Sequence, residues 1–150
     1  MSECRRGNRC DKHNRNCGIC AIQKGFEDVQ KAIAEFKKGV NEAEKCEFCE
    51  CVADVEQGLL DLHCGVVKLH DGVDNTDFKI RCRRKRAVEE ALCDCEECIC
   101  CIDEGLDEIC IGNVNRGIEI IEESIEIIEE NIDELQDMLG MGNCNNNSCR

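Results

Sequence analysis

The chain has 150 residues, of which 17 are cysteine, and carries a formal net charge of −14 with a sequence pI near 4.6. This charge argues against nucleic acid and membrane as partners, because nucleic acids and anionic membrane surfaces carry the same sign. The chain has no Trp or Tyr, four Phe and three His, so the usual linings of a catalytic pocket are scarce and we expect no enzyme. A chain of this length can form one domain with its own core.

Residues 1–20 form a basic, cysteine-rich N-terminal arm. No apolar run near Met1 resembles a signal-peptide core, so we expect synthesis in the cytoplasm, where thiols stay reduced. Within the arm, Cys10, His13, Cys17 and Cys20 have a spacing at which thiolates and an imidazole can hold zinc. The spacer between the two pairs is short, and motifs of this kind have many chance matches.

Two runs of apolar residues with heptad spacing follow the arm, over residues 22–43 and 52–69. Spacing of this kind predicts helices that pack side by side at shallow angles. The second run is out of phase with the first, so residues 44–51 contain a turn, a stutter or a kink. A turn and helix N-cap are predicted over residues 71–77.

Two more heptad runs occupy residues 88–109 and 114–139, separated by Gly112 and Asn113. Gly140 is expected to end the last helix, and residues 141–150 form an Asn- and Cys-rich tail. The pattern predicts an all-α fold in which residues 21–140 form an antiparallel four-helix bundle. The alternative is two long helical hairpins that complete their core by pairing with another copy.

Heptad phase predicts where the helical cysteines point. Cys95 falls at a core position, whereas Cys51 and Cys98 fall at position g, on the flank, and Cys64 falls at f, the outermost position. Outward positions are also predicted for Cys93 and Cys100, at b, and for Cys101, at c. Exposed free thiols are a hazard unless they are used, so cross-linking between elements or copies explains them best. The cross-linking candidates are Cys4, Cys10, Cys17, Cys20, Cys49, Cys51, Cys64, Cys93, Cys98, Cys100, Cys101, Cys144 and Cys149.

A metal-binding protein is the alternative function, with zinc or copper as the cofactor. The chain resembles copper storage proteins in size, helicity and cysteine count. A bundle that stores metal in its interior needs thiolates that point inward, layer after layer. The predicted core positions of this chain are instead aliphatic. On a helix, residues three apart share a face, so Cys46 with Cys49, and Cys95 with Cys98, can chelate a metal or form a local disulfide.

Charge is unevenly distributed along the chain. Residues 79–86 are strongly basic, whereas residues 87–140 contain 18 acids and a single base, Arg116. One interpretation is a solvated acidic face with a basic arm. The other is that basic segments of one copy meet the acidic helix of another and steer self-association. A second apolar stripe at Ile120 and Ile127 also suggests packing against a neighbour.

The tail, residues 142–149, reads Gly-Asn-Cys-Asn-Asn-Asn-Ser-Cys. Together with the cysteine clusters, it is similar to cysteine-rich spore coat and exosporium proteins of endospore-forming bacteria. The resemblance implies a self-assembling protective layer or filament cross-linked by disulfides, with the protein itself and other cysteine-rich coat proteins as partners. It also implies synthesis in the mother-cell cytoplasm and oxidation after that cell lyses, at the spore surface or in another extracellular assembly.

Overall fold

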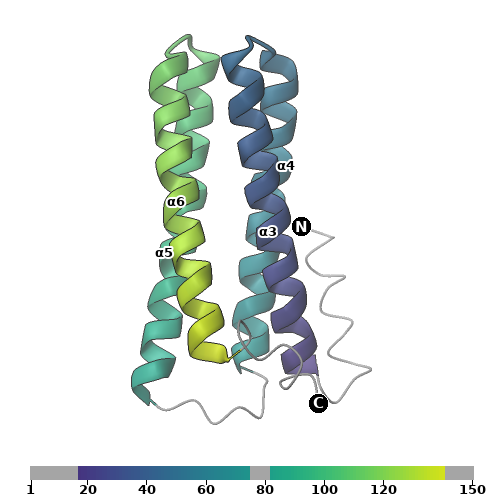
Figure 1. Ribbon diagram of the computed structural model, residues 1–150, viewed down its shortest axis with the longest axis vertical. Coiled ribbons are helices and arrows are strands. Elements are labelled where there is room, and N and C mark those ends of the chain that lie inside the picture. The colour runs from purple at the N-terminus through teal and green to yellow at the C-terminus, as the bar shows by residue number, and fades with distance from the viewer. Residues whose placement is uncertain (1–16, 75–81, 141–150) are drawn as a thin grey trace.

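The computed structural model describes residues 17–74 and 82–140, and within these ranges the chain forms four helices and no strand. The helices are α3 (Cys17–Glu44), α4 (Phe48–Asp74), α5 (Cys82–Cys110) and α6 (Val114–Leu139). They pack side by side as an antiparallel four-helix bundle, which confirms the predicted fold class (Figure 1).

The bundle consists of two helical hairpins, α3 with α4 and α5 with α6. Each hairpin is joined to the other along two seams, one between α4 and α5 and one between α3 and α6. The turns of both hairpins lie next to each other at one end of the bundle, which we call the closed end (top of Figure 1). Residues 45–47 and 111–113 are therefore neighbours in space, although they are far apart in the sequence.

The two turns share one backbone arrangement. The N–H of Glu47 donates to the carbonyl of Glu42 at 2.8 Å, and the N–H of Asn113 donates to the carbonyl of Glu108 at 2.8 Å. These bonds close the last helical turn as in a Schellman motif, which needs a residue in the left-handed region just before the donor. The expected break within residues 44–51 is thus a turn.

Some element boundaries differ from the expected ones. α3 begins at Cys17, so its first residues lie within the range predicted as arm, 1–20. α4 continues to Asp74, through the first part of the turn predicted over 71–77. α6 ends where expected, because Gly140 has a left-handed φ of 69°. The tail at 141–150 lies outside the described residues.

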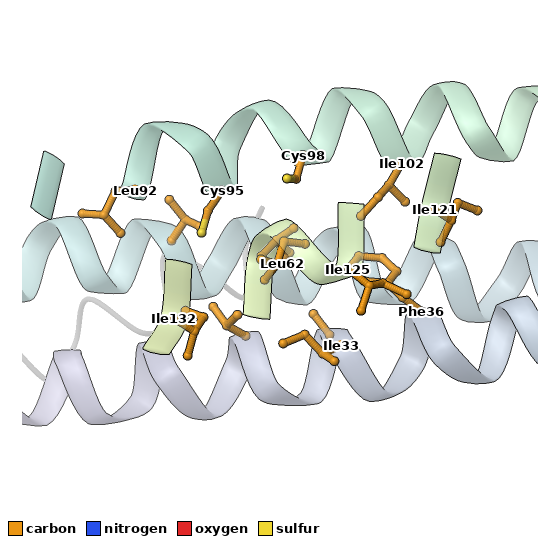
Figure 2. Packing of buried hydrophobic residues seen from close by; sticks show 14 of the residues in the cluster. Ile33, Phe36, Leu62, Leu92, Cys95, Cys98, Ile102, Ile121, Ile125 and Ile132 are labelled. Atoms are coloured by element: carbon orange, nitrogen blue, oxygen red, sulfur yellow. The ribbon is translucent and has the colours of Figure 1, made fainter. Parts of the chain in front are cut away.

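The heptad runs form the core, as predicted. Fully buried side chains include Phe36 from α3, Leu62 from α4, Leu92 from α5 and Ile121 from α6 (Figure 2). A few positions of the runs are only partly buried against this cluster: Val52, Leu59, Ile99 and Val114. Burial of this aliphatic surface is the main favourable term in forming the fold.

A second heptad pattern, made of small residues, lets the helices of each hairpin approach closely. A Cβ built on Gly25 would lie 2.9 Å from the carbonyl oxygen of Gly65, and one on Gly117 would lie 2.4 Å from that of Gly105. Only glycine allows two backbones this close. All the small positions are buried: Gly18, Gly25, Ala32, Gly39, Cys51, Gly58, Gly65, Gly72, Ala91, Cys98, Gly105, Gly117, Ser124 and Asn131.

Candidate functional site

Six cysteines of the described chain are both free and exposed, in two groups. The closed-end thiols are Cys46, Cys49 and Cys110, from the first turn and from the helix ends beside it. The α5-face thiols are Cys93, Cys100 and Cys101, from the middle of α5. These six thiols are open to solvent, so oxidants and other proteins can reach them.

Three free cysteines are instead part of the core. Burial raises the pKa of Cys51 to about 11, and burial together with neighbouring charges raises the pKa of Cys95 and of Cys98 to about 12. Figure 2 shows Cys95 and Cys98 on α5, with aliphatic side chains around them. Because the thiolate is the nucleophile and the metal ligand, these protonated thiols are inert at neutral pH.

The prediction that Cys51, Cys64 and Cys98 lie on flank or outer positions was wrong. Cys51 is 0 % exposed and Cys98 is 2 % exposed, because both occupy the small-residue positions where the two helices of a hairpin approach closely. Cys64 is 4 % exposed and disulfide-bonded, so it offers no exposed free thiol to another copy. The outward placement of Cys93, Cys100 and Cys101, and the core placement of Cys95, are confirmed.

Several predicted site residues fall outside the described part of the chain. They are Cys4, Cys10, His13, Cys144 and Cys149. Of the predicted zinc motif, the structure describes Cys17 as the first residue of α3 and Cys20 as half-buried on the same helix. The motif thus remains a prediction.

An apolar groove lies at the closed end, on the seam between α4 and α5. It has a volume of about 580 Å³ and contains two closed-end thiols, Cys49 and Cys110. Its remaining lining residues are Phe48, Val52, Ile109, Gly112 and Val114. Phe48 is 38 % exposed and Ile111, next to the groove, is 72 % exposed, which makes them two of the three exposed large hydrophobic residues of the described chain.

A second groove follows the other seam, between α3 and α6. Its volume is about 360 Å³, and its walls combine Lys37, Val40 and Ile125 with a row of glutamates. Lys37 Nζ crosses this seam to Glu129 Oε2 at 3.0 Å. On the opposite seam His70 Nε2 lies 2.8 Å from Glu96 Oε1. Polar side-chain contacts of this kind join the two hairpins at their surface.

Carboxyl groups pair along the flank of the α3–α4 hairpin. Burial, followed by the hydrogen bond and charge of Asp61, raises the pKa of Glu35 to about 7. The hydrogen bond to Asp54 raises the pKa of Glu42. Lys31 Nζ lies 3.8 Å from Asp61 Oδ2. A carboxyl group held at such a pKa shares a proton with its neighbour near neutral pH, because two adjacent carboxylates repel each other.

The described residues contain no cluster of three or more His, Cys, Asp or Glu side chains placed to hold a metal ion. The predicted pair of Cys95 and Cys98 is buried in the core, and Cys46 lies in a turn while Cys49 lies on α4. None of the helices formed by residues 17–74 and 82–140 combines the length and apolar character needed to cross a membrane.

Comparison with known proteins identifies no relative. No protein family, no curated protein and no solved structure matches the chain.

Proposed function

We propose that this protein is a self-assembling structural protein whose copies are joined by intermolecular disulfides into a layer, lattice or filament. The observation that carries the proposal is the set of six free, exposed thiols on a fold whose interior is filled by aliphatic side chains. Burial explains Cys51, Cys95 and Cys98 as core residues. It does not explain the exposed six, for which joining to another chain is the simplest use.

The chemistry of each link is thiol oxidation. A thiol from each of two copies loses its proton and one electron, and a sulfur–sulfur bond forms between the chains. The two electrons reduce a low-molecular-weight disulfide to two thiols. In a reducing cytoplasm the links do not persist, whereas in an oxidising environment they do. Synthesis in the reduced state followed by release would therefore separate production of the subunit from assembly.

The resemblance to cysteine-rich spore coat and exosporium proteins supports a spore-surface location for this assembly. The cysteines of the tail, Cys144 and Cys149, and of the arm, Cys4 and Cys10, add thiols at both ends of the sequence. In such an assembly, other cysteine-rich coat proteins are partners alongside further copies of this chain.

The test is electrophoresis of the purified full-length protein without reductant, combined with metal analysis of the same sample. We expect a ladder of multimers after exposure to oxidised glutathione, its collapse to a monomer band on reduction, and no stoichiometric metal. A monomer that contains several equivalents of zinc or copper and does not cross-link would refute the proposal in favour of metal storage.

A further inference from the structure

We infer that the closed end of the bundle is the surface where two copies meet, end to end about a two-fold axis, and that the closed-end thiols seal this contact. The inference rests on the proposed function and names the surface involved. Three independent features support it: exposed apolar side chains, the backbone conformation of Cys46, and the distribution of charge.

The first feature is apolar surface at the tips of the hairpins. Phe48 lines the groove of about 580 Å³, Ile111 lies between its lining residues Cys110 and Gly112 in the sequence, and both side chains are exposed. A two-fold axis through the closed end would place Phe48 or Ile111 of one copy against the groove of the other. Burying these side chains is favourable, and large exposed apolar groups that cluster in this way mark interaction surfaces.

The second feature is the left-handed conformation of Cys46, which has a φ of 64°. The other hairpin turn has Gly112 at the equivalent place, with a φ of 104°. A residue with a Cβ is disfavoured in this region, and such strain persists at functional sites. Cysteine at a position that favours glycine therefore indicates that the thiol itself has a use at the tip of the turn.

The third feature is that the closed end carries both signs of charge. Lys45 and Arg116 are exposed there, beside the acidic residues Glu47, Glu50 and Glu108. Arg116 is 4.0 Å from its intrahelical partner and its side chain is 64 % exposed, so it remains available to a second copy. A two-fold contact can pair the bases of each copy with the acids of the other.

The remaining exposed thiols lie on the acidic part of α5, beyond the exposed bases Arg84, Lys85 and Arg86 at its start. Nine acids and no base occur between residues 87 and 110, and most of the acids are exposed around Cys93, Cys100 and Cys101. Two such faces repel each other, and this like-charge contact opposes disulfide formation between them. The α5-face thiols thus form a matched comparison, equal in number to the closed-end thiols and likewise exposed, but different in surroundings.

The sealing step is thiol–disulfide exchange with a low-molecular-weight disulfide. The thiolate of Cys49 attacks oxidised glutathione, forms a mixed disulfide and releases one glutathione thiolate. A closed-end thiolate of the second copy, such as that of Cys110, then attacks the protein sulfur and releases the second glutathione. Two protein thiols lose two protons and two electrons, and one glutathione disulfide becomes two glutathione thiols.

The contact itself is tested without oxidation, by sedimentation velocity of the full chain in reductant over a range of concentrations. We expect a monomer–dimer equilibrium that Phe48→Gln and Ile111→Gln each weaken at least tenfold. Ile127→Gln is the matched control, because Ile127 is 45 % exposed on the acidic side of α6 and should leave the equilibrium unchanged. Monomer at all concentrations, or equal effects of all three variants, would overturn the inference.

The seal is tested with two triple variants treated with oxidised glutathione, each made in a full-length chain whose arm and tail cysteines (Cys4, Cys10, Cys144 and Cys149) are replaced by Ser. Replacing the closed-end thiols (Cys46→Ser, Cys49→Ser, Cys110→Ser) should reduce the yield of covalent dimer at least tenfold. Replacing the α5-face thiols (Cys93→Ser, Cys100→Ser, Cys101→Ser) should leave the yield unchanged. Cys46→Gly gives a second readout, because it should raise the midpoint temperature of unfolding while lowering the dimer yield.

The outcomes separate this inference from the proposed function. If the α5-face variant loses its dimers and the closed-end variant keeps them, copies cross-link through another surface, and only the closed-end inference fails. If the unmodified protein forms no covalent multimer at all, both fail together.

Discussion

The seams within the two hairpins differ from the seams between them. Inside each hairpin, small residues repeat every seventh position and the helix backbones touch, as at Gly25 with Gly65 and at Gly105 with Gly117. Between the hairpins, each seam has a groove towards the closed end. Ion pairs do not distinguish the two kinds of seam, because they join α3 to α4 as well as one hairpin to the other. The difference shows that the hairpin is the closely packed unit of this fold, and that the grooves lie where the hairpins meet.

The largest expected effect comes from filling a backbone contact within a hairpin. A Cβ at Gly117 would lie 2.4 Å from the Gly105 carbonyl oxygen and 2.5 Å from Ile109. We expect Gly117→Val to lower the free energy of unfolding by about 3 kcal/mol, because backbone atoms cannot move aside as a side chain can. Urea unfolding measures the change, with Ala34→Val, an exposed position on α3, as the control.

A smaller effect is expected where the small residue is a cysteine. Cys98→Leu adds volume between α5 and α6 and should cost about 2 kcal/mol. Cys93→Leu, on the exposed face of the same helix, should change the free energy of unfolding by less than about 0.5 kcal/mol. Equal effects of the two substitutions would contradict the distinction between core thiols and exposed thiols.

The carboxyl pairs of the α3–α4 hairpin predict that the fold loses stability as pH rises. The pKa of Glu35 is about 7 in the folded state, whereas the ordinary pKa of a glutamate, which applies in the unfolded state, is 4.5. The folded state therefore binds more protons than the unfolded state between these pH values. Its stabilising contribution is complete below pH 4.5 and is lost as pH rises through 7, by about 1 kcal/mol after allowance for solvent screening.

Thermal unfolding at a series of pH values measures this loss. We expect Glu35→Gln to flatten the decline between pH 5 and pH 8, because the amide cannot ionise. Glu27→Gln, an exposed glutamate on the same helix, should leave the slope as it is. A slope that persists in Glu35→Gln would assign the pH dependence to other groups.

The smallest effect belongs to the seam between hairpins. Lys37→Ala removes the 3.0 Å contact with Glu129, in which both side chains are largely open to solvent. Exposed ion pairs of this kind contribute about 0.5 kcal/mol or less. Salt screens this contact, so raising the salt concentration should lower the unfolding midpoint of the unmodified protein by a similarly small amount. A loss of stability in Lys37→Ala comparable to that of Gly117→Val would contradict the ranking of the seams.

The apolar heptads predicted the four helices and most of the core, because their period reports directly which face of each helix is buried. They misplaced Cys51 and Cys98, because the core was read from large apolar side chains alone. The sequence does contain the missing signal, since Gly58, Gly65 and Gly72 continue the seven-residue spacing from Cys51. Small residues at that spacing indicate close packing, which buries a position that would otherwise be on the flank.

The groove at the closed end could not be predicted from the sequence. It joins residues 48–52 to residues 109–114, and no local pattern brings these two segments together. The left-handed φ of Cys46 was equally hidden, because cysteine seldom adopts that conformation and the residue type therefore does not predict it. The groove follows from the way the two hairpins align in the bundle, whereas the φ of Cys46 follows from the turn that ends α3.

The central claim is that exposed cysteines join one copy to the next. Its most direct test is oxidation of an equal mixture of unlabelled and ¹⁵N-labelled protein, followed by mass spectrometry of the disulfide-linked peptides. We predict mixed-isotope pairs that contain Cys46, Cys49 or Cys110, and none that contain Cys51, Cys95 or Cys98. Disulfide peptides that are all of one isotope would show that the bonds form within chains, and would contradict the account.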